Sequence, residues 1–435
     1  MSRVANSALM IAAFLLSAAA AAAVAAGVRI DDGRLFAALV LAPAGLAFAS
    51  LLVLLRGSIR QRQSAVLLGA ALLTSLYLVN VLIILLPTRH FERPPRIDRR
   101  DRVAIMRDLR TKGIPAYVAL PAGAVRNLVP STVPLSNPAL RVLVHCSESQ
   151  ETTLFNSDER GFNNPRGLWA EKADIALVGD SFVLGACVWP GETWAGVIRQ
   201  RVARTLALAM DDFGPLAQLG VIMEYLPQVR PRHVFWVYYE WNDLRDLRSE
   251  LESPALAGYL DNRTQELAAR QPSIDSALTQ LIDSIARVPR IVRAPEVAPP
   301  PRLESFFWWA KLGPLRKAAE LDNLPERLAR CCDMRTLEQA LRRARTTVES
   351  WGGQLHFIYL PAALRYYRPA SAYLDDAMRR RRQVLRMAGT LMPVLDLDSV
   401  FRDAGPRELY VHAQSHLNAH GYAVAGTAVL DHLFR

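Results

Sequence analysis

A serine directly follows a short apolar segment of this chain. Residues 173–178 read Ala-Asp-Ile-Ala-Leu-Val, and Gly179, Asp180 and Ser181 come next. The segment predicts a buried strand, and open α/β folds place their sites at the carboxyl ends of such strands. Gly179 allows a tight turn there, which would leave the backbone N–H of Ser181 free to bind an oxyanion. Ser181 is therefore a candidate nucleophile.

Two further polar positions could complete such a site. Asn242 follows a predicted strand at residues 233–239, so its side-chain N–H could donate to an oxyanion, although an Asn-Asp turn that caps the strand is the alternative. His416 precedes the last predicted helix and could act as general base for a serine across the sheet. Two nearby histidines are its rivals: His412 and His420.

Strands and helices alternate in the part of the chain that holds these residues. The predicted strands are residues 173–178, 206–210, 233–239, 354–360 and 392–397. A helical period is present at residues 194–206, 215–229, 334–351, 373–390 and 419–434. This alternation predicts an α/β fold in which a parallel sheet is covered on both faces. Residues 250–330 interrupt the rhythm and are interpreted as an insertion.

The motifs resemble the four sequence blocks of the SGNH/GDSL hydrolases, over residues 155–435 outside the insertion. The matching segments are Gly179-Asp180-Ser181-Phe182, Gly214-Pro215-Leu216, Asn242-Asp243 and His416-Leu417-Asn418. The resemblance implies a three-layer, flavodoxin-like domain with Ser181 as nucleophile and His416 as general base. It also implies an oxyanion hole formed by the N–H groups of Ser181 and Gly214 and by the side chain of Asn242.

The sequence departs from this family's pattern at two places. The family has an Asp two or three positions before the histidine, where this chain has Ala413 and Gln414. Asp398, another carboxylate or a backbone carbonyl would then have to orient His416. A glycine of the second block is replaced by Asp212, whose charge would oppose an oxyanion if it pointed inward.

The cysteines carry a narrower resemblance. Residues 157–165, together with Cys146 and Cys187, are similar to a group of uncharacterised bacterial membrane proteins with this domain, which implies an extracytoplasmic site and a Cys146–Cys187 disulfide. By composition alone the two could equally be buried free thiols. Cys331 and Cys332 are adjacent and would bond to one another only under strain. The spacing of Cys and His fits no metal site, so no metal or cofactor is expected.

Three apolar runs precede the predicted domain, at residues 8–27, 35–55 and 65–86. Each is long enough to cross roughly 30 Å of hydrocarbon, so residues 1–87 are predicted to form three transmembrane helices, or a signal peptide and two helices. In both cases the C-terminal domain of a multi-pass inner-membrane protein lies in the periplasm. The arginines of residues 89–102 would by themselves favour a cytoplasmic domain, and the argument from the site outweighs them.

The net charge of +11 does not by itself indicate nucleic-acid binding. The arginines are scattered along predicted helices and beside the apolar runs, where they can meet anionic lipid headgroups, and no nucleic-acid-binding motif is present. We therefore expect a lipid bilayer, and not nucleic acid, as a partner. Residues 88–154 are interpreted as a basic juxtamembrane connector and N-terminal extension.

The sequence thus predicts a membrane-anchored serine esterase or O-acyltransferase that acts on an acylated glycan or lipid of the cell envelope. The alternative is a catalytically degenerate domain that binds a glycan or a partner protein during surface-polymer assembly, and the missing acid favours it. A third interpretation is a membrane scaffold whose spans carry the function.

Overall fold

The computed structural model describes residues 100–287 and 333–434, except 127, 129–131, 147–151, 368–371 and 413–414, and a few single residues before 100. The apolar runs of residues 1–87 lie outside the described residues apart from those single positions, as do Cys331 and Cys332. Within the described residues, no helix has the length and hydropathy needed to cross a membrane.

Five strands form one sheet in which every neighbouring pair is parallel, in the order β5-β4-β6-β7-β8. The strands are β4 (Ile175–Gly179), β5 (Thr205–Ala209), β6 (His233–Tyr239), β7 (Gln354–Leu360) and β8 (Val394–Asp396). The predicted strands are confirmed, each within two residues at either end. Of these five strands β4 comes first in the chain but second in the sheet, with β5 on one side and β6 on the other, so the order of strands reverses at β4.

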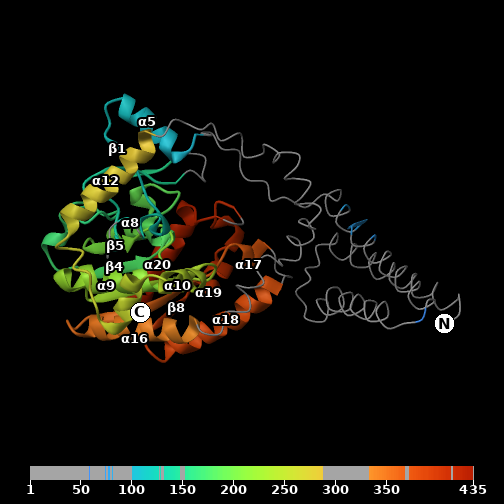
Figure 1. Cartoon of the computed structure of the whole chain (residues 1–435). Coiled ribbons are helices and arrows are strands. Elements are labelled where there is room, and N and C mark those ends of the chain that lie inside the picture. The colour runs from blue at the N-terminus through green and yellow to red at the C-terminus, as the bar shows by residue number, and fades with distance from the viewer. Residues whose placement is uncertain are drawn as a thin grey trace. The chain divides into compact units, whose positions relative to one another are not determined.

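Helices cover both faces of this sheet, which makes a three-layer α/β structure (Figure 1). One layer contains α7 (Ser181–Leu184), α8 (Trp194–Arg199), α19 (Leu397–Asp403) and α20 (Ala419–Phe434). The other contains α9 (Pro215–Val229), α10 (Asp243–Leu251), α12 (Gln271–Arg287), α16 (Asp333–Glu349) and α18 (Ala372–Gly389). Shorter helices are α11 (Pro254–Ala257) and α17 (Leu364–Tyr367).

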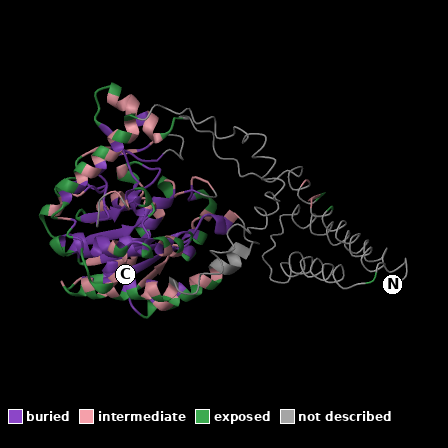
Figure 2. Cartoon of the chain, viewed as in Figure 1, coloured by how far each residue is buried: buried purple, intermediate pink, exposed green. Residues whose placement is uncertain are grey.

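Alternating strand residues supply the two cores. Ala176 and Val178 of β4 pack with the α9 layer, whereas Ile175 and Leu177 pack with the α20 layer. A strand has a period of two residues, so one that is covered on both faces must be apolar throughout. The sheet accordingly lies in the buried interior, and exposed residues are on the outer sides of the helices and in the loops (Figure 2).

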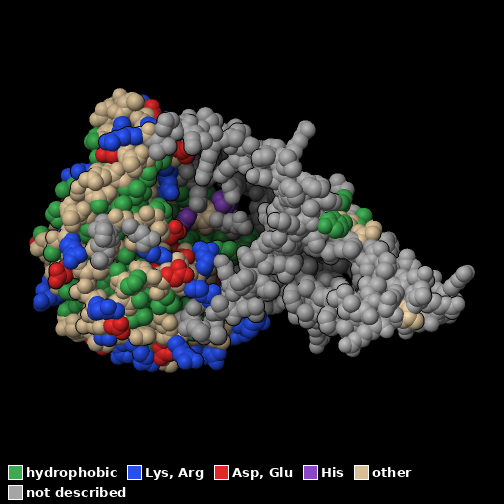
Figure 3. All heavy atoms as spheres, viewed as in Figure 1, with side chains coloured by type: hydrophobic (Ala, Val, Ile, Leu, Met, Phe, Trp, Pro, Cys, Tyr) green, Lys and Arg blue, Asp and Glu red, His purple; other side chains and the backbone are tan. Residues whose placement is uncertain are grey.

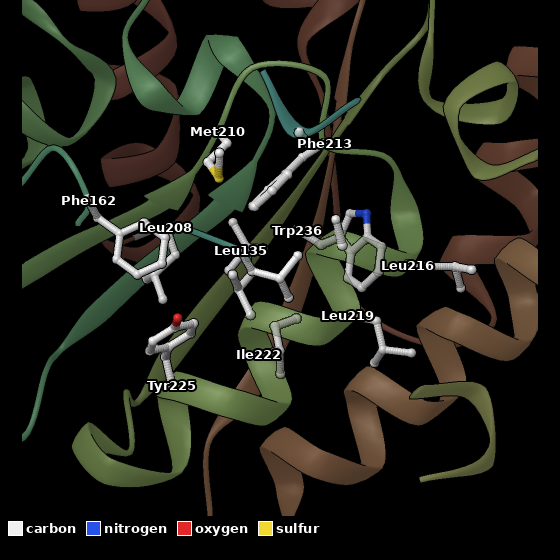
Figure 4. Close-up of a cluster of buried hydrophobic side chains, with 14 of the residues drawn as sticks. Leu135, Phe162, Leu208, Met210, Phe213, Leu216, Leu219, Ile222, Tyr225 and Trp236 are labelled. Carbon is white, nitrogen blue, oxygen red and sulfur yellow. The ribbon is translucent and has the colours of Figure 1, made fainter. Parts of the chain in front are cut away.

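The core beside α9 is the larger of the two. Leu216, Leu219 and Ile222 of α9 lie against Leu208 of β5 and Trp236 of β6, and all five side chains are fully buried (Figure 4). Burial of this kind contributes roughly 1.5–3 kcal/mol for each large apolar side chain. It fixes the position of α9, and with it the loop between β5 and α9.

The segment before β4 forms a second, smaller sheet with the order β1-β2-β3. Its elements are α5 (Arg102–Thr111), β1 (Ala116–Val118), α6 (Ala122–Val125), β2 (Val142–Val144) and β3 (Leu154–Asn156). Ile105, Met106 and Val144 belong to the same core as α9, and the small sheet lies in one compact unit with the five-stranded sheet. Residues 100–146 are therefore an integral layer of the domain.

Charged side chains are distributed over the surface of this unit. On the face shown in Figure 3, arginines gather along the edge formed by α16 and α18, and elsewhere basic side chains are interspersed with acidic and apolar ones. On α16, Arg342 and Arg345 are paired with Glu338 and Glu349, one turn away. Exposed pairs of this kind contribute little to stability.

Three histidines form a hydrogen-bonded row near the amino-terminal ends of the strands. His233 Nδ1 lies 3.1 Å from His356 Nε2, and His356 Nδ1 lies 3.3 Å from His432 Nε2 of α20. Burial, followed by the two neighbouring histidines, lowers the pKa of His356 to about 3. The folded protein therefore keeps His356 neutral at pH values where an unfolded histidine becomes charged.

The stability of the domain should consequently depend on His356 in mild acid. Between pH values of about 6.5 and 3, the unfolded chain binds a proton at this position that the folded chain does not. The free energy of unfolding is then highest above this window and falls as the pH drops through it, by at most about 1.4 kcal/mol per pH unit. Denaturant unfolding of the purified full-length chain gives the free energy of unfolding at several pH values. We expect this free energy to depend less steeply on pH in His356→Gln than in the parent chain. The control His420→Gln, at an exposed histidine, should keep the original slope; an equal slope in both variants would contradict this assignment.

Candidate active site

Ser181 and His416 meet at the carboxyl-terminal edge of the five-stranded sheet. The Oγ atom of Ser181 lies 2.8 Å from Nε2 of His416, within hydrogen-bond distance, although the residues are 235 positions apart. Ser181 follows β4 and His416 precedes α20, as the sequence predicted. The pair lies where the order of strands reverses, which is the usual position of a ligand site in an open α/β sheet.

The pair opens into a pocket of about 460 Å³. The β4 and β6 ends contribute Asp180, Ser181, Phe182, Tyr239, Trp241 and Asn242. The loop after β5 contributes Asp211 and Asp212, and the segment before β4 contributes Arg102, Pro121, His145 and Cys146. The region interpreted as a connector from sequence therefore forms one wall of the site.

Local geometry brings Ser181 to this edge. The side chain of Asp180 accepts a hydrogen bond of 3.0 Å from the N–H of Phe182 and so caps the short helix α7. Gly179 lies so close to the next turn that a Cβ atom would come within 2.5 Å of Val183. Gly185 ends α7 with a φ of 87°, in the left-handed region that favours glycine. The chain can therefore turn sharply before and after the serine.

Packing holds the imidazole of His416 in place. Its ring lies 4.8 Å from the ring of Phe182, measured between centroids, and its Nδ1 atom lies 3.9 Å from Sγ of Cys187. The carbonyl of His416 accepts a hydrogen bond from the N–H of Val411, and the side chain of Asn418 bonds to the carbonyl of Glu408. Of its rivals, His420 is exposed and borders a different pocket, and His412 does not line the pocket of Ser181.

The predicted disulfide between Cys146 and Cys187 is confirmed. It joins the segment after β2 to the segment after α7, and its Cys187 sulfur is the atom that faces Nδ1 of His416. The bond therefore ties the N-terminal wall of the pocket to the serine and histidine loops.

Asp398, one of the alternatives considered for orienting His416, is held by other partners. Asp398 is buried at the start of α19, where it accepts a hydrogen bond of 2.9 Å from Tyr366 and one of 3.3 Å from Arg402. Arg365, which is itself paired with Glu240, also lies 3.9 Å from it. Asp398 is thus part of a structural ion-pair network with the neighbouring arginines.

The predicted role of Gly214 in an oxyanion hole is wrong, because its N–H is already used. Glu250 of α10 accepts hydrogen bonds from the N–H groups of Gly214, Leu216 and Ala217, at 2.9, 2.8 and 3.2 Å. These groups are the unpaired donors at the start of α9, so Glu250 caps that helix from a neighbouring one. Burial raises the pKa of Glu250 to about 8, despite the three N–H donors.

Asp212 has the backbone conformation that a glycine would favour. Its φ of 63° lies in the left-handed region, and Asp212 lines the pocket. Among the residues that the structure describes, neither its N–H nor that of Ser181 has a hydrogen-bond acceptor. Asn242 is buried at the end of β6, and its side chain favours the ionised form of the neighbouring Asp180. The structure thus places Ser181, Asp212 and Asn242, rather than Gly214, around one pocket.

The pocket has a charged wall that sequence reasoning missed. His145 Nε2 lies 2.9 Å from Oδ1 of Asp211, and Arg102 donates to the other oxygen of Asp211 at 3.3 Å and to the carbonyl of His145 at 3.0 Å. Burial alone would raise the pKa of Asp211, but the charges of His145 and Arg102 lower it well below its ordinary value. Asp211 is therefore ionised. The one signal for this cluster in the sequence is that His145 is adjacent to Cys146, for which a disulfide was expected.

Other carboxyl groups near the serine hold their protons more tightly. Burial raises the pKa of Asp180 to about 7 and that of Asp246 to about 6, and it raises the pKa of Asp243 as well. The charges of Asp180 and Asp246 add to the effect on Asp243. Close carboxyl groups without enough cations cannot all ionise. A mixture of neutral and charged acids therefore lies behind Ser181.

The segment of residues 157–165 supports β5 and the short helix α7, which begins at Ser181. Asp158 is buried and accepts hydrogen bonds from the N–H of Phe162 and the side chain of Asn164. Asn164 in turn makes two hydrogen bonds, of 2.8 and 3.0 Å, with the backbone of edge strand β5. Asn163 donates to the last carbonyl of α7 at 2.9 Å. The motif thus helps to position Ser181 without lining the pocket itself.

Comparison of the chain with protein-family models and with curated proteins gives no match. The described part of the chain contains no group of three or more His, Cys, Asp or Glu side chains arranged to hold a metal ion. The geometry alone therefore defines the class of site: a serine–histidine pair at the edge of a parallel sheet, in a pocket that is also lined by the ionised Asp211 and by Asp212.

Loss of the disulfide should loosen this site. Closure of a loop across 41 positions is expected to contribute roughly 3–4 kcal/mol in the chain-entropy description. We expect the double variant Cys146→Ala/Cys187→Ala to have a lower melting temperature than the parent chain. A thiol reductant should lower the melting temperature of the parent to that of the variant while leaving the variant unchanged. Equal melting temperatures of the parent with and without the reductant, with reduction verified by thiol alkylation and mass spectrometry, would argue against this role.

Proposed function

We propose that this chain is a membrane-anchored serine hydrolase of the SGNH/GDSL type, an esterase or O-acyltransferase. The hydrogen bond between Ser181 and His416 is the observation that carries the proposal. The strand order supports it as well, because with β4 taken as the first strand the sheet reads 2-1-3-4-5, the order of flavodoxin-like folds. The resemblance of the Ser181, Asn242 and His416 segments to three of the four SGNH blocks is consistent with both observations.

In this mechanism, His416 removes the proton from Ser181 as the oxygen attacks an acyl carbonyl. The N–H groups of Ser181 and Asp212 and the side chain of Asn242 stabilise the tetrahedral oxyanion, with Asp212 in the place first expected for Gly214. His416 then gives its proton to the departing alcohol, and an acyl-Ser181 ester remains. Water or a sugar hydroxyl attacks that ester while His416 takes its proton. The bond between the acyl carbon and Ser181 Oγ then breaks, His416 returns the proton to Oγ, and Ser181 is restored.

The ionised carboxylate of Asp211 compensates for the absence of an Asp shortly before His416. Asp211 and the protonated form of His416 attract one another, since the charge of His416 is among the influences that lower the pKa of Asp211. The Arg102 and His145 contacts keep Asp211 in place. We infer that Asp211 stabilises the imidazolium of His416 through the field across the pocket, without a direct hydrogen bond.

The proposed location is the periplasmic side of an inner membrane. The Cys146–Cys187 disulfide supports an oxidising compartment, and the three apolar runs of residues 8–27, 35–55 and 65–86 support membrane anchoring. The substrate class that follows is an acylated glycan or lipid of the cell envelope.

A fluorophosphonate probe tests the nucleophile directly. It should label the purified full-length chain at Ser181, as mapped by peptide mass spectrometry, and Ser181→Ala should abolish labelling. His416→Ala should slow labelling by roughly a hundredfold to ten-thousandfold, because the serine loses its base.

Ser399→Ala is a suitable control, because Ser399 is an exposed serine of α19 outside the pocket. Labelling that persists in Ser181→Ala would refute the assignment of the nucleophile. A folded parent chain that is not labelled at any pH would instead favour the catalytically degenerate, glycan- or partner-binding domain.

The pH profile of labelling tests the role of Asp211. Asp211→Asn keeps the shape of the side chain and removes its charge, so protonated His416 loses a favourable interaction. The acidic midpoint of the labelling rate should shift to lower pH by roughly half a unit, and the maximal rate should fall. Asp403→Asn, at an exposed acid of α19, should leave the profile unchanged. A lower rate without a shifted midpoint would leave Asp211 with a purely structural role.

A further inference from the structure

Trp241 is an exposed aromatic side chain that lines the same pocket as Ser181. Its side chain is 45% exposed, although it follows a buried strand, β6, and precedes the buried Asn242. Tyr239 and Phe182, whose rings lie 4.4 Å apart between centroids, continue the aromatic surface toward His416. A flat apolar surface thus borders the nucleophile on the side of β6.

The part of the pocket formed by the loop after β5 is acidic. Asp211 and Asp212 both line it, and Asp211 is ionised. The neighbouring cation, Arg102, is already hydrogen-bonded to Asp211 and to the carbonyl of His145. A phosphate or carboxylate on a ligand would therefore meet negative charge here, whereas a neutral hydroxyl group can donate a hydrogen bond to a carboxylate oxygen.

The remaining lining argues against a long acyl chain. Nine of the fifteen lining residues are polar or charged, and the whole pocket has a volume of about 460 Å³. A fatty acyl chain would need a continuous apolar channel, because polar groups that it covered would lose their contact with water. A short acyl group such as acetyl has no such requirement.

We propose that this pocket binds a short-chain acyl ester of an uncharged sugar, with one face of the sugar ring on Trp241 and its hydroxyl groups toward Asp211 and Asp212. A pyranose ring presents C–H groups on one face and hydroxyl groups at its rim, so it matches a pocket that offers both an aromatic and an acidic surface. The inference rests on the proposed function, because the ester carbonyl must reach Ser181. It narrows that function from a glycan or lipid to a neutral glycan.

Steady-state kinetics of the purified full-length chain with small esters test this substrate class. The probes are an O-acetylated methyl glucoside, the corresponding methyl glucuronoside, p-nitrophenyl acetate and p-nitrophenyl palmitate. We expect Trp241→Ala to raise KM for the acetylated glucoside roughly tenfold, with kcat nearly unchanged, because the sugar loses its apolar contact.

Two variants control for the size and the position of the aromatic group. Trp241→Phe keeps an aromatic surface and should retain most of the affinity for the glucoside. Trp189→Ala removes a tryptophan that is similarly exposed, at 44%, but does not line the pocket, and it should leave every KM unchanged.

Binding to Ser181→Ala tests the subsite independently of turnover. Isothermal titration calorimetry should show the glucoside binding at least roughly tenfold more tightly than the charged glucuronoside, and Trp241→Ala in this background should weaken glucoside binding by a similar factor. Equal affinity for the two sugars, an unaffected KM in Trp241→Ala, or a preference for p-nitrophenyl palmitate over the acetate would overturn the inference. Sugar binding without labelling or cleavage in the parent chain would uphold this subsite and remove only the proposed hydrolase.

Discussion

The parallel arrangement of β4 and β6 is the constraint on which this site depends. Because neighbouring parallel strands end at the same edge, the residues after β4 and β6 must lie together, and these residues are Ser181 and Asn242. His416 reaches the same edge from the loop before α20, which packs on α8. The packing of the α20 layer against the sheet therefore sets the 2.8 Å contact between Ser181 and His416.

Charge in the pocket is arranged by burial and by pairing. Asp211 is ionised because Arg102 and His145 bind it, whereas burial without a matching cation leaves Asp180 and Glu250 with raised pKa values. A serine–histidine pair without a neighbouring acid has a weaker base. In the proposed mechanism, the ionised Asp211 supplies from a different part of the chain the attraction that the missing acid would have given.

The segment before β4 has two roles that its basic composition conceals. Its small sheet extends the core around α9, and its residues Arg102, His145 and Cys146 form one wall of the pocket. The Cys146–Cys187 disulfide couples this wall to the loop that carries Ser181. The domain and its pocket consequently form one unit, and changes at residues 102–146 are expected to affect the site directly.

Much of this arrangement was encoded locally. Short apolar runs predicted the strands, period-3.6 hydrophobicity predicted the long helices, and the turn after β4 marked Ser181, because these signals depend on short stretches of sequence. Pairings between distant segments depend on packing, and here only the tertiary structure decided the outcome. In the folded chain the N–H of Gly214 donates to Glu250, and Asp398 lies among arginines. Arg102 and His145 both contact Asp211. A buried charge or N–H group binds whichever partner the fold places within reach, and the spacing of residues along the chain does not record that choice.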